Sequence, residues 1–208
     1  MTKIYIETHV LKAHLIIAPK NDVRFYLNGI LVDTVNRRIV STDGHCMLVT
    51  RFDASAIEGD SVPDFIISRD QLSTGIKTTF KKMPTVITYD QETSVISVSA
   101  VVGPPIDGKF PDIARVIPTT LSGETSHYDA ELVNRVSDAL IMAANSHGNS
   151  NNRPTLFQNG TSPAIMTFWG DAFGVVMPMR SDATASDALI LVDSIMNRKV
   201  KESESIAA

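Results

Sequence analysis

The chain has 208 residues, of which 43% are hydrophobic and 20% are charged. This composition supports a sizeable buried core and excludes a chain that is disordered over most of its length. The formal net charge of −4 argues against a protein that coats nucleic acid through bulk positive charge, but not against one with a local basic surface.

A single cysteine, Cys46, excludes an intrachain disulfide and a cysteine-rich zinc site, and it favours a reducing compartment. No hydrophobic run approaches the length of a membrane span, and the first residues lack the apolar core of a signal peptide. We therefore expect a cytoplasmic globular protein with no cofactor.

The first part of the chain predicts one helix among antiparallel strands. Residues 3–6 alternate like a strand, and Thr8 is the expected N-cap of an apolar-periodic helix from Val10 to Ala18 that stops at Pro19. Three strands are then expected, with tight turns at Val35-Asn36 and Asp43-Gly44, over residues 25–32, 38–42 and 47–52.

The same order then returns twice. The second copy has a strand at 64–68, a helix at 69–80 and strands at 85–89, 95–100 and 101–107. The third copy begins with a helix whose expected N-cap is Asp129, and it continues with strands at 154–158, 164–169 and 174–179. About three copies of a unit of about 55 residues are typical of a repeat-built architecture.

Two polar stretches and a final helix complete the predicted organisation. Residues 118–125 form a polar connection, and residues 144–153 form a polar loop. A helix is expected over 187–198, with a frayed end after it. The chain is thus divided into residues 1–121, residues 122–181, and a C-terminal helix and tail at 182–208.

Residue patterns for catalysis are weak. No two of the five histidines have metal-ligand spacing within one element, and neither a glycine-rich phosphate loop nor a Gly-x-Ser-x-Gly motif occurs. Asp43 and His45 could act as an acid and a base, but a hairpin turn with a partly exposed histidine is the simpler interpretation. An enzyme is not expected.

Four short motifs occur in a fixed order along the chain. They are Tyr26-Leu27-Asn28-Gly29, Thr42-Asp43-Gly44-His45, Phe110-Pro111-Asp112 and Val176-Met177-Pro178-Met179-Arg180. In this order they resemble the bacterial DNA polymerase III beta subunit, the sliding clamp. Residues 2–118 resemble the middle domain of that family, and residues 127–180 resemble the second half of its last domain, with Tyr128-Asp129 where the family tends to have Phe-Asn.

The resemblance implies an α+β DNA-clamp fold of repeated βαβββ units, with antiparallel sheets outside and helices lining one face. It implies a processivity factor that encircles duplex DNA without reading its sequence and that binds peptides of DNA polymerase and of the clamp loader. Family rings contain six domains, so a two-domain chain is expected to close as a homotrimer. The first family domain has no counterpart here, which is a departure that bears on ring closure.

The resemblance also assigns a hydrophobic cleft for partner peptides. Aliphatic residues and methionine form its apolar walls, and Thr42, His45 and Arg180 fix the polar groups of the peptide. The assigned residues are Leu27, Thr42, Gly44, His45, Met47, Pro111, Arg115, Val116, Val175, Val176, Met177, Pro178, Met179 and Arg180. A plain core strand is the alternative for residues 175–179. Cys46 stands where the family usually has a basic residue, which removes a positive charge from the rim.

DNA contacts are expected from a basic, helix-lined surface. The resemblance points to Arg24, Phe25 and Tyr26 near the channel mouth, and the outward faces of the helices add Lys12, Lys77 and Arg135. An ordinary solvated helix face is the alternative for these three basic residues.

Two other functions remain open at the level of sequence. One is a clamp-fold adaptor or inhibitor that binds clamp partners without forming a ring. The other is a small hydrolase that uses Asp43 and His45.

Overall fold

The computed structural model describes residues 1–79, 83–145, 153–181 and 185–196. Residues Met1–Pro178 form one compact unit and Met179–Ala208 form another. The second unit contains helix α4 (Ala185–Ile195), on which Leu189, Leu191 and Ile195 are exposed. All other described helices and strands belong to the first unit.

The first unit consists of three successive helix-and-strand repeats, as the sequence predicts. Repeat 1 is β1 (Thr2–Ile6), α1 (Thr8–Ile17), β2 (Gly29–Asp33), β3 (Arg38–Thr42) and β4 (Cys46–Arg51). Repeat 2 is β6 (Phe65–Ser68), α2 (Arg69–Thr78), β7 (Thr85–Asp90), β8 (Val95–Val98) and β9 (Val101–Gly103). Repeat 3 is α3 (Ala130–Ala143), β10 (Thr155–Phe157), β11 (Ala164–Thr167) and β12 (Ala172–Val176). Strand β5 (Ile57–Glu58) and the 3₁₀ turns η1 (Phe25–Leu27), η2 (Ala54–Ala56) and η3 (Ile113–Arg115) lie between these elements.

Repeats 1 and 2 exchange their first strands. Strand β1 pairs with β7, with Ile6 opposite Thr85, and β6 pairs with β2, with Ser68 opposite Gly29. Each sheet therefore contains strands of both repeats, and neither repeat is complete without the other.

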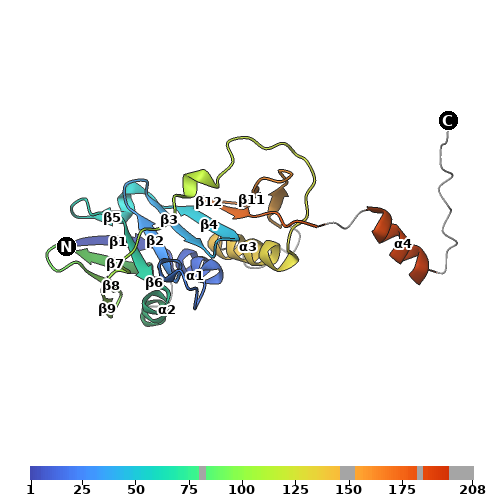
Figure 1. Cartoon of the computed structure of the whole chain (residues 1–208). Coiled ribbons are helices and arrows are strands. Elements are labelled where there is room, and N and C mark those ends of the chain that lie inside the picture. The colour runs from blue at the N-terminus through green and yellow to red at the C-terminus, as the bar shows by residue number, and fades with distance from the viewer. Residues whose placement is uncertain (80–82, 146–152, 182–184, 197–208) are drawn as a thin grey trace, which may run out of the picture. The chain divides into compact units, whose positions relative to one another are not determined.

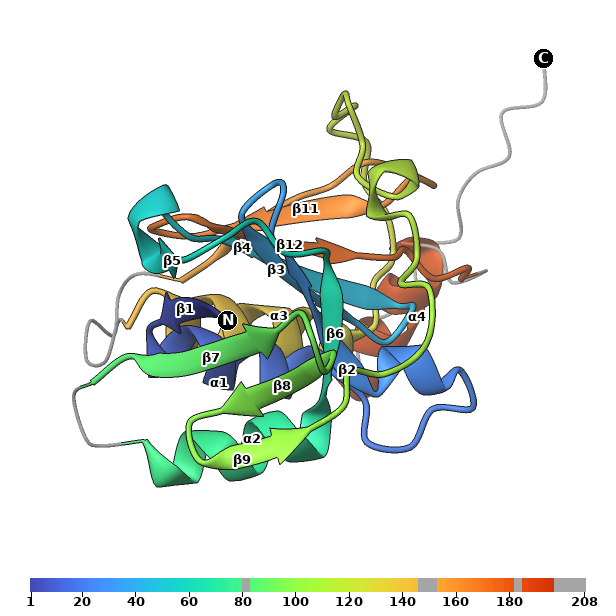
Figure 2. The same ribbon diagram turned by 90° about the vertical axis from the view of Figure 1, so that its left-hand side faces the viewer.

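The strands form two sheets in which every pairing is antiparallel, so the expected α+β class is confirmed. The five-stranded sheet has the order β5-β1-β7-β8-β9, and the seven-stranded sheet has the order β10-β11-β12-β4-β3-β2-β6. In Figure 1, helices α1, α2 and α3 lie along the lower side of the strands. In the turned view of Figure 2, α1 and α3 are seen between β4 and β12 above and β7 and β8 below.

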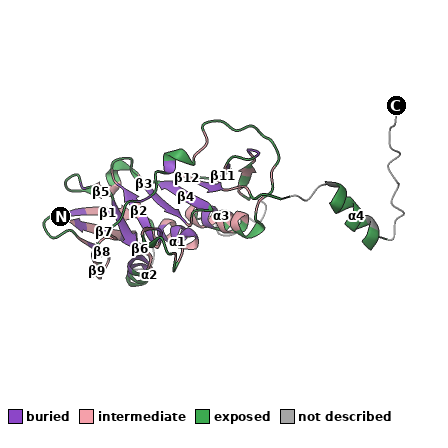
Figure 3. Ribbon diagram, in the orientation of Figure 1, coloured by how far each residue is buried: buried purple, intermediate pink, exposed green. Residues whose placement is uncertain are grey.

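The core lies between the helices and the strands, where Figure 3 shows the buried residues. Alternating burial along β1 and β7 identifies one face of the five-stranded sheet as the core face. A second cluster joins α1 to α3 through Ala13, Ile17, Val136 and Leu140. A side chain at Gly174 on β12 would clash with Val136, so this glycine allows α3 to approach the sheet.

The third repeat joins the first by backbone pairing. Strand β12 runs antiparallel to β4, with Gly174 opposite Leu48 and Val175 opposite Met47. Strands that come before and strands that come after residues 121 and 122 therefore belong to one sheet. The sequence places a domain boundary between these two residues, and that boundary stays a prediction.

The sequence predicts N-cap residues for two helices, and the structure shows which of them caps its helix. The Asp129 carboxylate accepts a hydrogen bond from the backbone N–H of Glu131, so the predicted N-cap of α3 is confirmed. The predicted cap at Thr8 is wrong, because Glu7 precedes the helix and the Thr8 hydroxyl bonds to the Met83 carbonyl instead.

The strand expected over residues 25–32 begins only at Gly29. Residues 25–27 form η1, because the Asn28 side chain bonds twice to the backbone of Asp22 and closes this segment into a loop. Most of the predicted loop at 144–153 and much of the C-terminal segment from residue 182 lie outside the described residues.

A fully buried histidine lies in the core of repeat 1. On α1, His14 Nδ1 lies 2.8 Å from the Ser41 hydroxyl, and Nε2 lies 2.9 Å from the Thr50 hydroxyl. Two hydroxyl partners suit a neutral imidazole, which donates one hydrogen bond and accepts another. Burial lowers the pKa of His14 from 6.5 to about 3.

We predict that His14 makes the fold sensitive to acid. Because its folded pKa lies below its unfolded pKa, the stability is complete above pH 6.5 and is lost as the pH falls toward about 3. Urea unfolding should show a loss of about 2 kcal/mol between pH 7 and pH 5 from this one group. His14→Gln should reduce this pH dependence; a slope in the His14→Gln variant equal to that of the unmodified chain would contradict the prediction.

Candidate functional site

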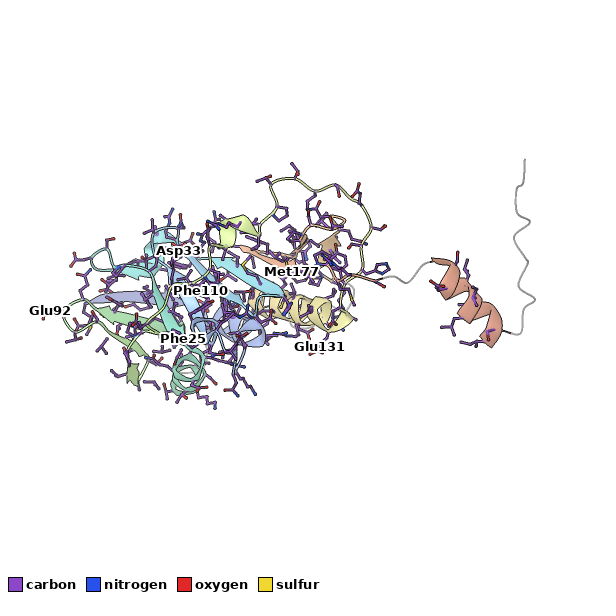
Figure 4. All side chains as sticks on the ribbon, viewed as in Figure 1. Phe25, Asp33, Glu92, Phe110, Glu131 and Met177 are labelled. Carbon is purple, nitrogen blue, oxygen red and sulfur yellow. The ribbon has the colours of Figure 1, made fainter. Side chains whose placement is uncertain are left out.

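A pocket of about 180 Å³ opens at one end of the seven-stranded sheet, where four separate segments meet. Its walls come from the η1 segment, the turn between β3 and β4, the loop around η3 and the end of β12. The lining residues are Arg24, Tyr26, Leu27, Thr42, Gly44, His45, Cys46, Met47, Pro111, Asp112, Ile113, Val116, Val175 and Met177. Figure 4 labels Met177 at this end of the sheet.

The floor of the pocket is apolar. Leu27, Met47 and Val175 are buried, and they belong to one hydrophobic cluster with Phe110 and Ile113. Val116, at the rim, is a partly exposed apolar side chain. An apolar floor with conformable methionine side chains fits aliphatic or aromatic side chains of a ligand.

The turn between β3 and β4 forms the polar rim. The Asp43 carboxylate accepts hydrogen bonds of 2.8 Å from the backbone N–H groups of both His45 and Cys46. The Thr42 hydroxyl donates to the Cys46 carbonyl and accepts from the Gly44 N–H. Gly44 has a φ of +89°, which a residue with a side chain would adopt only with strain. The turn is therefore held in one shape before any ligand binds.

Two arginines fasten this turn to other elements. Arg135 on α3 makes a 2.8 Å ion pair with Asp43 and also donates to the carbonyls of Ile16 and Ile17 at the end of α1. Arg24 donates to the Asp43 carbonyl and to the Asp22 carboxylate. The position of the rim thus depends on α1 and α3 as well as on its own strands.

The electrostatics of Asp43 and Cys46 follow from this arrangement. Burial alone would raise the pKa of Asp43, but the N–H groups of Cys46 and His45 and the Arg135 guanidinium outweigh it and lower that pKa. Burial, followed by the neighbouring Asp43 carboxylate, raises the pKa of Cys46 to about 12. Cys46 therefore stays a protonated thiol near neutral pH and is a poor nucleophile.

Backbone pairing brings the two ends of the pocket wall together. Val175 lies opposite Met47 in the β4–β12 pairing, and the Met177 N–H donates a 2.9 Å hydrogen bond to the His45 carbonyl. Residues that are far apart in sequence therefore form one continuous wall.

Most of the predicted cleft residues meet in this pocket. Those that line it are Leu27, Thr42, Gly44, His45, Met47, Pro111, Val116, Val175 and Met177. Arg115 is exposed and does not line it, Pro178 does not line it, and Val176 is fully buried in the cluster under α3. Met179 and Arg180 belong to the second compact unit. A binding role for the predicted set stays a prediction.

The pocket also contains residues that the sequence did not assign to it. Arg24 and Tyr26 were predicted at a DNA surface, whereas the structure places them on the pocket wall. Asp112 and Ile113 directly follow the predicted Pro111, and Asp112 caps η3 through the N–H of Ala114. The capping pattern of Asp112 was the one sequence signal that could have extended the predicted wall.

The predicted DNA residues differ in availability. Lys12 on α1 and Lys77 on α2 are exposed, and Phe25 is 56% exposed. The guanidinium of Arg135 is engaged by Asp43 and two carbonyls, and that of Arg24 is engaged by Asp22 and Asp43. The two lysines are therefore better candidates for contacts with phosphate groups than the two arginines.

Metal chemistry finds no support in the part of the chain that the structure describes. Within residues 1–79, 83–145, 153–181 and 185–196, no three His, Cys, Asp or Glu side chains gather in a way that could hold a metal ion. In the same residues, no helix has the length and apolar character needed to cross a membrane.

Comparison with solved structures identifies the architecture. The Helicobacter pylori beta clamp bound to a DNA ligase peptide superposes with a TM-score of 0.61 at 14% sequence identity, covering 86% of this chain and 66% of that chain. The DNA polymerase III subunit beta of Pseudomonas aeruginosa superposes with a TM-score of 0.61 at 18% identity, with the same coverage. The DnaN sliding clamp of Bartonella birtlesii bound to griselimycin superposes with a TM-score of 0.61 at 19% identity, again with the same coverage of both chains.

This chain has the fold of a bacterial sliding clamp. It is a shortened and divergent version of that fold, because it spans just under two thirds of the length of these clamps at below 20% identity. No protein-family model matches the chain, and no curated protein matches it by sequence. The clamp fold expected from the four short motifs is thereby confirmed.

We predict that Arg135→Ala destabilises the fold by about 2 kcal/mol, because it removes the cation that pairs with the largely buried Asp43 carboxylate and the donor to two carbonyls at the end of α1. Urea unfolding at neutral pH measures the effect. Arg51→Ala is the matched control, since its ion pair with Asp171 is exposed on both sides and should be worth less than about 1 kcal/mol. Equal losses for both variants would contradict the role given to Arg135.

Proposed function

We propose that this protein is a non-enzymatic sliding-clamp factor of DNA replication that binds short peptides of its partners in the pocket at the end of the seven-stranded sheet. The single observation that supports it best is the pocket itself, since Leu27, Met47, Val175 and Met177 from distant segments line one apolar cavity on a clamp fold. The Helicobacter pylori clamp of the same fold is bound to a DNA ligase peptide.

The pocket suits an extended peptide with an aliphatic or aromatic anchor. The apolar floor would bury the anchor, while the ring of exposed His45 offers a hydrogen bond at the rim. The proposed partners are therefore peptides of DNA polymerase and of a clamp loader. Cys46 brings no positive charge to this rim, so we expect acidic peptides to bind less well than neutral ones.

For DNA, we propose sequence-independent retention of a duplex along the helix side of the molecule by an oligomeric ring. The exposed Lys12 and Lys77 lie on helices of that side, while the chain as a whole is acidic. Few positive contacts would leave a duplex free to move, because each phosphate contact adds salt-dependent affinity. The proposed location is the cytoplasm, where such a factor acts.

A hydrolase that uses Asp43 and His45 is less well supported. Both backbone N–H groups and Arg135 bond to the Asp43 carboxylate, so this side chain stabilises a turn. A proton-transfer role would require it to give up these partners.

One observation favours a second candidate, a clamp-fold adaptor or inhibitor that binds clamp partners without forming a ring. The chain spans 66% of the length of the clamps that it resembles. Peptide binding is common to both candidates, and only retention on DNA separates them.

We predict that Met177→Ala weakens peptide binding by at least about tenfold, because the side chain lines the pocket and its truncation removes apolar contact with the anchor. Fluorescence anisotropy with a labelled polymerase peptide measures the affinity. Leu27→Ala should act in the same direction but also cost stability, since Leu27 is buried, so folding is checked by circular dichroism.

Val102→Ala serves as the matched control for these two variants. Val102 is exposed on β9 of the other sheet, away from the residues that line the pocket. Unchanged affinity in folded Met177→Ala would refute the assignment of the pocket.

We predict that the protein stays on circular duplex DNA and is lost from linear DNA with open ends. Encirclement requires a free end or an opened ring for release, so blocking both ends of the linear DNA should restore retention. Gel filtration of the protein mixed with each DNA, at low and at high salt, measures the retained fraction, and salt should change this fraction only slightly. Equal retention on open linear and circular DNA would favour simple binding, and no retention on either would favour the adaptor.

A further inference from the structure

The seven-stranded sheet has two ends, and the pocket lies at one of them. At the other end, β10 and β12 begin and β11 and β4 end, because these neighbours run antiparallel. Strand β3 also begins there, since Arg38 lies opposite Arg51. This end, the arginine end, carries Arg37, Arg38, Arg51, Arg153 and Trp169.

Two arginines of this end face each other across neighbouring strands. Arg38 on β3 lies opposite Arg51 on β4, and such positions have Cβ atoms about 5 Å apart. Arg38 shares a sheet face with Val40, and Arg51 shares it with Val49, which is the face that α1 and α3 do not cover. Like charges at directly opposite positions destabilise a sheet, so a bound anion would remove a cost.

Carboxylates compensate these two arginines only in part. Arg38 donates through Nε to the buried Asp33, and Arg51 donates through Nη2 to Asp171 at 2.7 Å. The side chains of Arg51 and Asp171 are 68% and 62% exposed, so their ion pair is weak and can give way to a phosphate group.

The remaining charges of the arginine end lie at its surface. Arg37 follows β2 and Arg153 precedes β10, and both are exposed. Exposed Asp53 follows β4 and lowers the net positive charge. The arginine end is therefore only moderately basic, which suits a few phosphate contacts rather than many.

The one tryptophan of the chain lies beside these arginines. Trp169 belongs to the turn between β11 and β12 and is 66% exposed. The turn adjoins Arg51, whose N–H donates a 2.8 Å hydrogen bond to the Asp171 carbonyl. A Cβ at Gly170 would meet no atom within 4 Å, so the space beside the turn is open. The indole thus offers a broad apolar surface to a ligand.

We propose that the arginine end binds single-stranded nucleic acid, with a base stacked on Trp169 and phosphate groups on Arg51 and Arg38. An aromatic ring beside guanidinium groups matches the alternation of base and phosphate along a single strand. A duplex keeps its bases stacked inside and fits less well. An acidic peptide would pair with the arginines but would leave the indole uncovered.

The size and position of the arginine end make this a separate site. From β10 to β3 there are four strand spacings, or about 19 Å, which is room for several nucleotides. The site lies at the end of the sheet opposite the pocket and does not involve the lysines of α1 and α2. The inference therefore goes beyond the proposed function and does not rest on it.

The fluorescence of Trp169 tests the proposal directly, because the chain has no other tryptophan. The full chain is titrated with a thymidine oligonucleotide of about ten nucleotides, and stacking should quench the emission. The same oligonucleotide in a duplex should quench much less. The logarithm of the affinity should fall by about two for each tenfold rise in salt, as expected for three phosphate contacts. A uridine oligonucleotide of equal length distinguishes RNA from DNA as the natural strand.

Point variants locate the binding, with the anisotropy of a labelled oligonucleotide as the measurement. Trp169→Ala should weaken binding at least about fivefold, and Trp169→Phe should keep most of it, because phenylalanine still stacks. Arg51→Ala should weaken binding and reduce the salt slope by about 0.7. Lys3→Ala is the control, since it removes a partly exposed cation of the five-stranded sheet, and it should change neither quantity.

The absence of quenching, or equal quenching by single strand and duplex, would overturn the proposal. So would a folded Trp169→Ala variant that binds as tightly as the unmodified chain. Tighter binding of a polyglutamate peptide than of the oligonucleotide would also overturn it and would identify an acidic protein segment as the ligand. Circular dichroism of each variant confirms that the fold is intact.

Discussion

The backbone pairing between β4 and β12 is the interaction on which the other features of this molecule depend. It joins the third repeat to the first, extends one sheet to seven strands and places Val175 opposite Met47 at the pocket floor. The Met177 N–H continues the pairing to His45 at the rim. Without it, the apolar side chains of the pocket would belong to two separate surfaces, and neither would enclose a ligand.

The rim of the pocket depends on a partly buried charge as well as on its own strands. Asp43 satisfies two N–H groups of its turn and pairs with Arg135, which also holds the end of α1. A turn that is fixed in this way loses little conformational freedom when a peptide binds. The same bonds engage the guanidinium of Arg135, so this group is not available for contacts with a duplex on the helix side. Arg135 therefore stabilises the pocket rim instead.

Local patterns in the sequence predicted much of the fold, and long-range contacts account for the rest. Helical periodicity and the Asp129 cap located α3, and alternating residues located β7 and β8, because these signals arise within a few residues. The turn at residues 25–27 was predicted as a strand because the hydrogen bonds of Asn28 to Asp22 leave no periodic signal. The partners of Arg24 and Arg135 could not be predicted, since they lie on other elements that only the tertiary fold brings near.

The distance along the chain between β4 and β12 also determines when the pocket can exist. Cys46–Arg51 leaves the ribosome long before Ala172–Val176, and a contact between segments this far apart forms late in folding. A nascent chain that has completed repeats 1 and 2 still exposes the β4 edge and lacks the part of the pocket wall that Val175 and Met177 supply. The pocket is therefore complete only after the third repeat has been synthesised and has paired with the first.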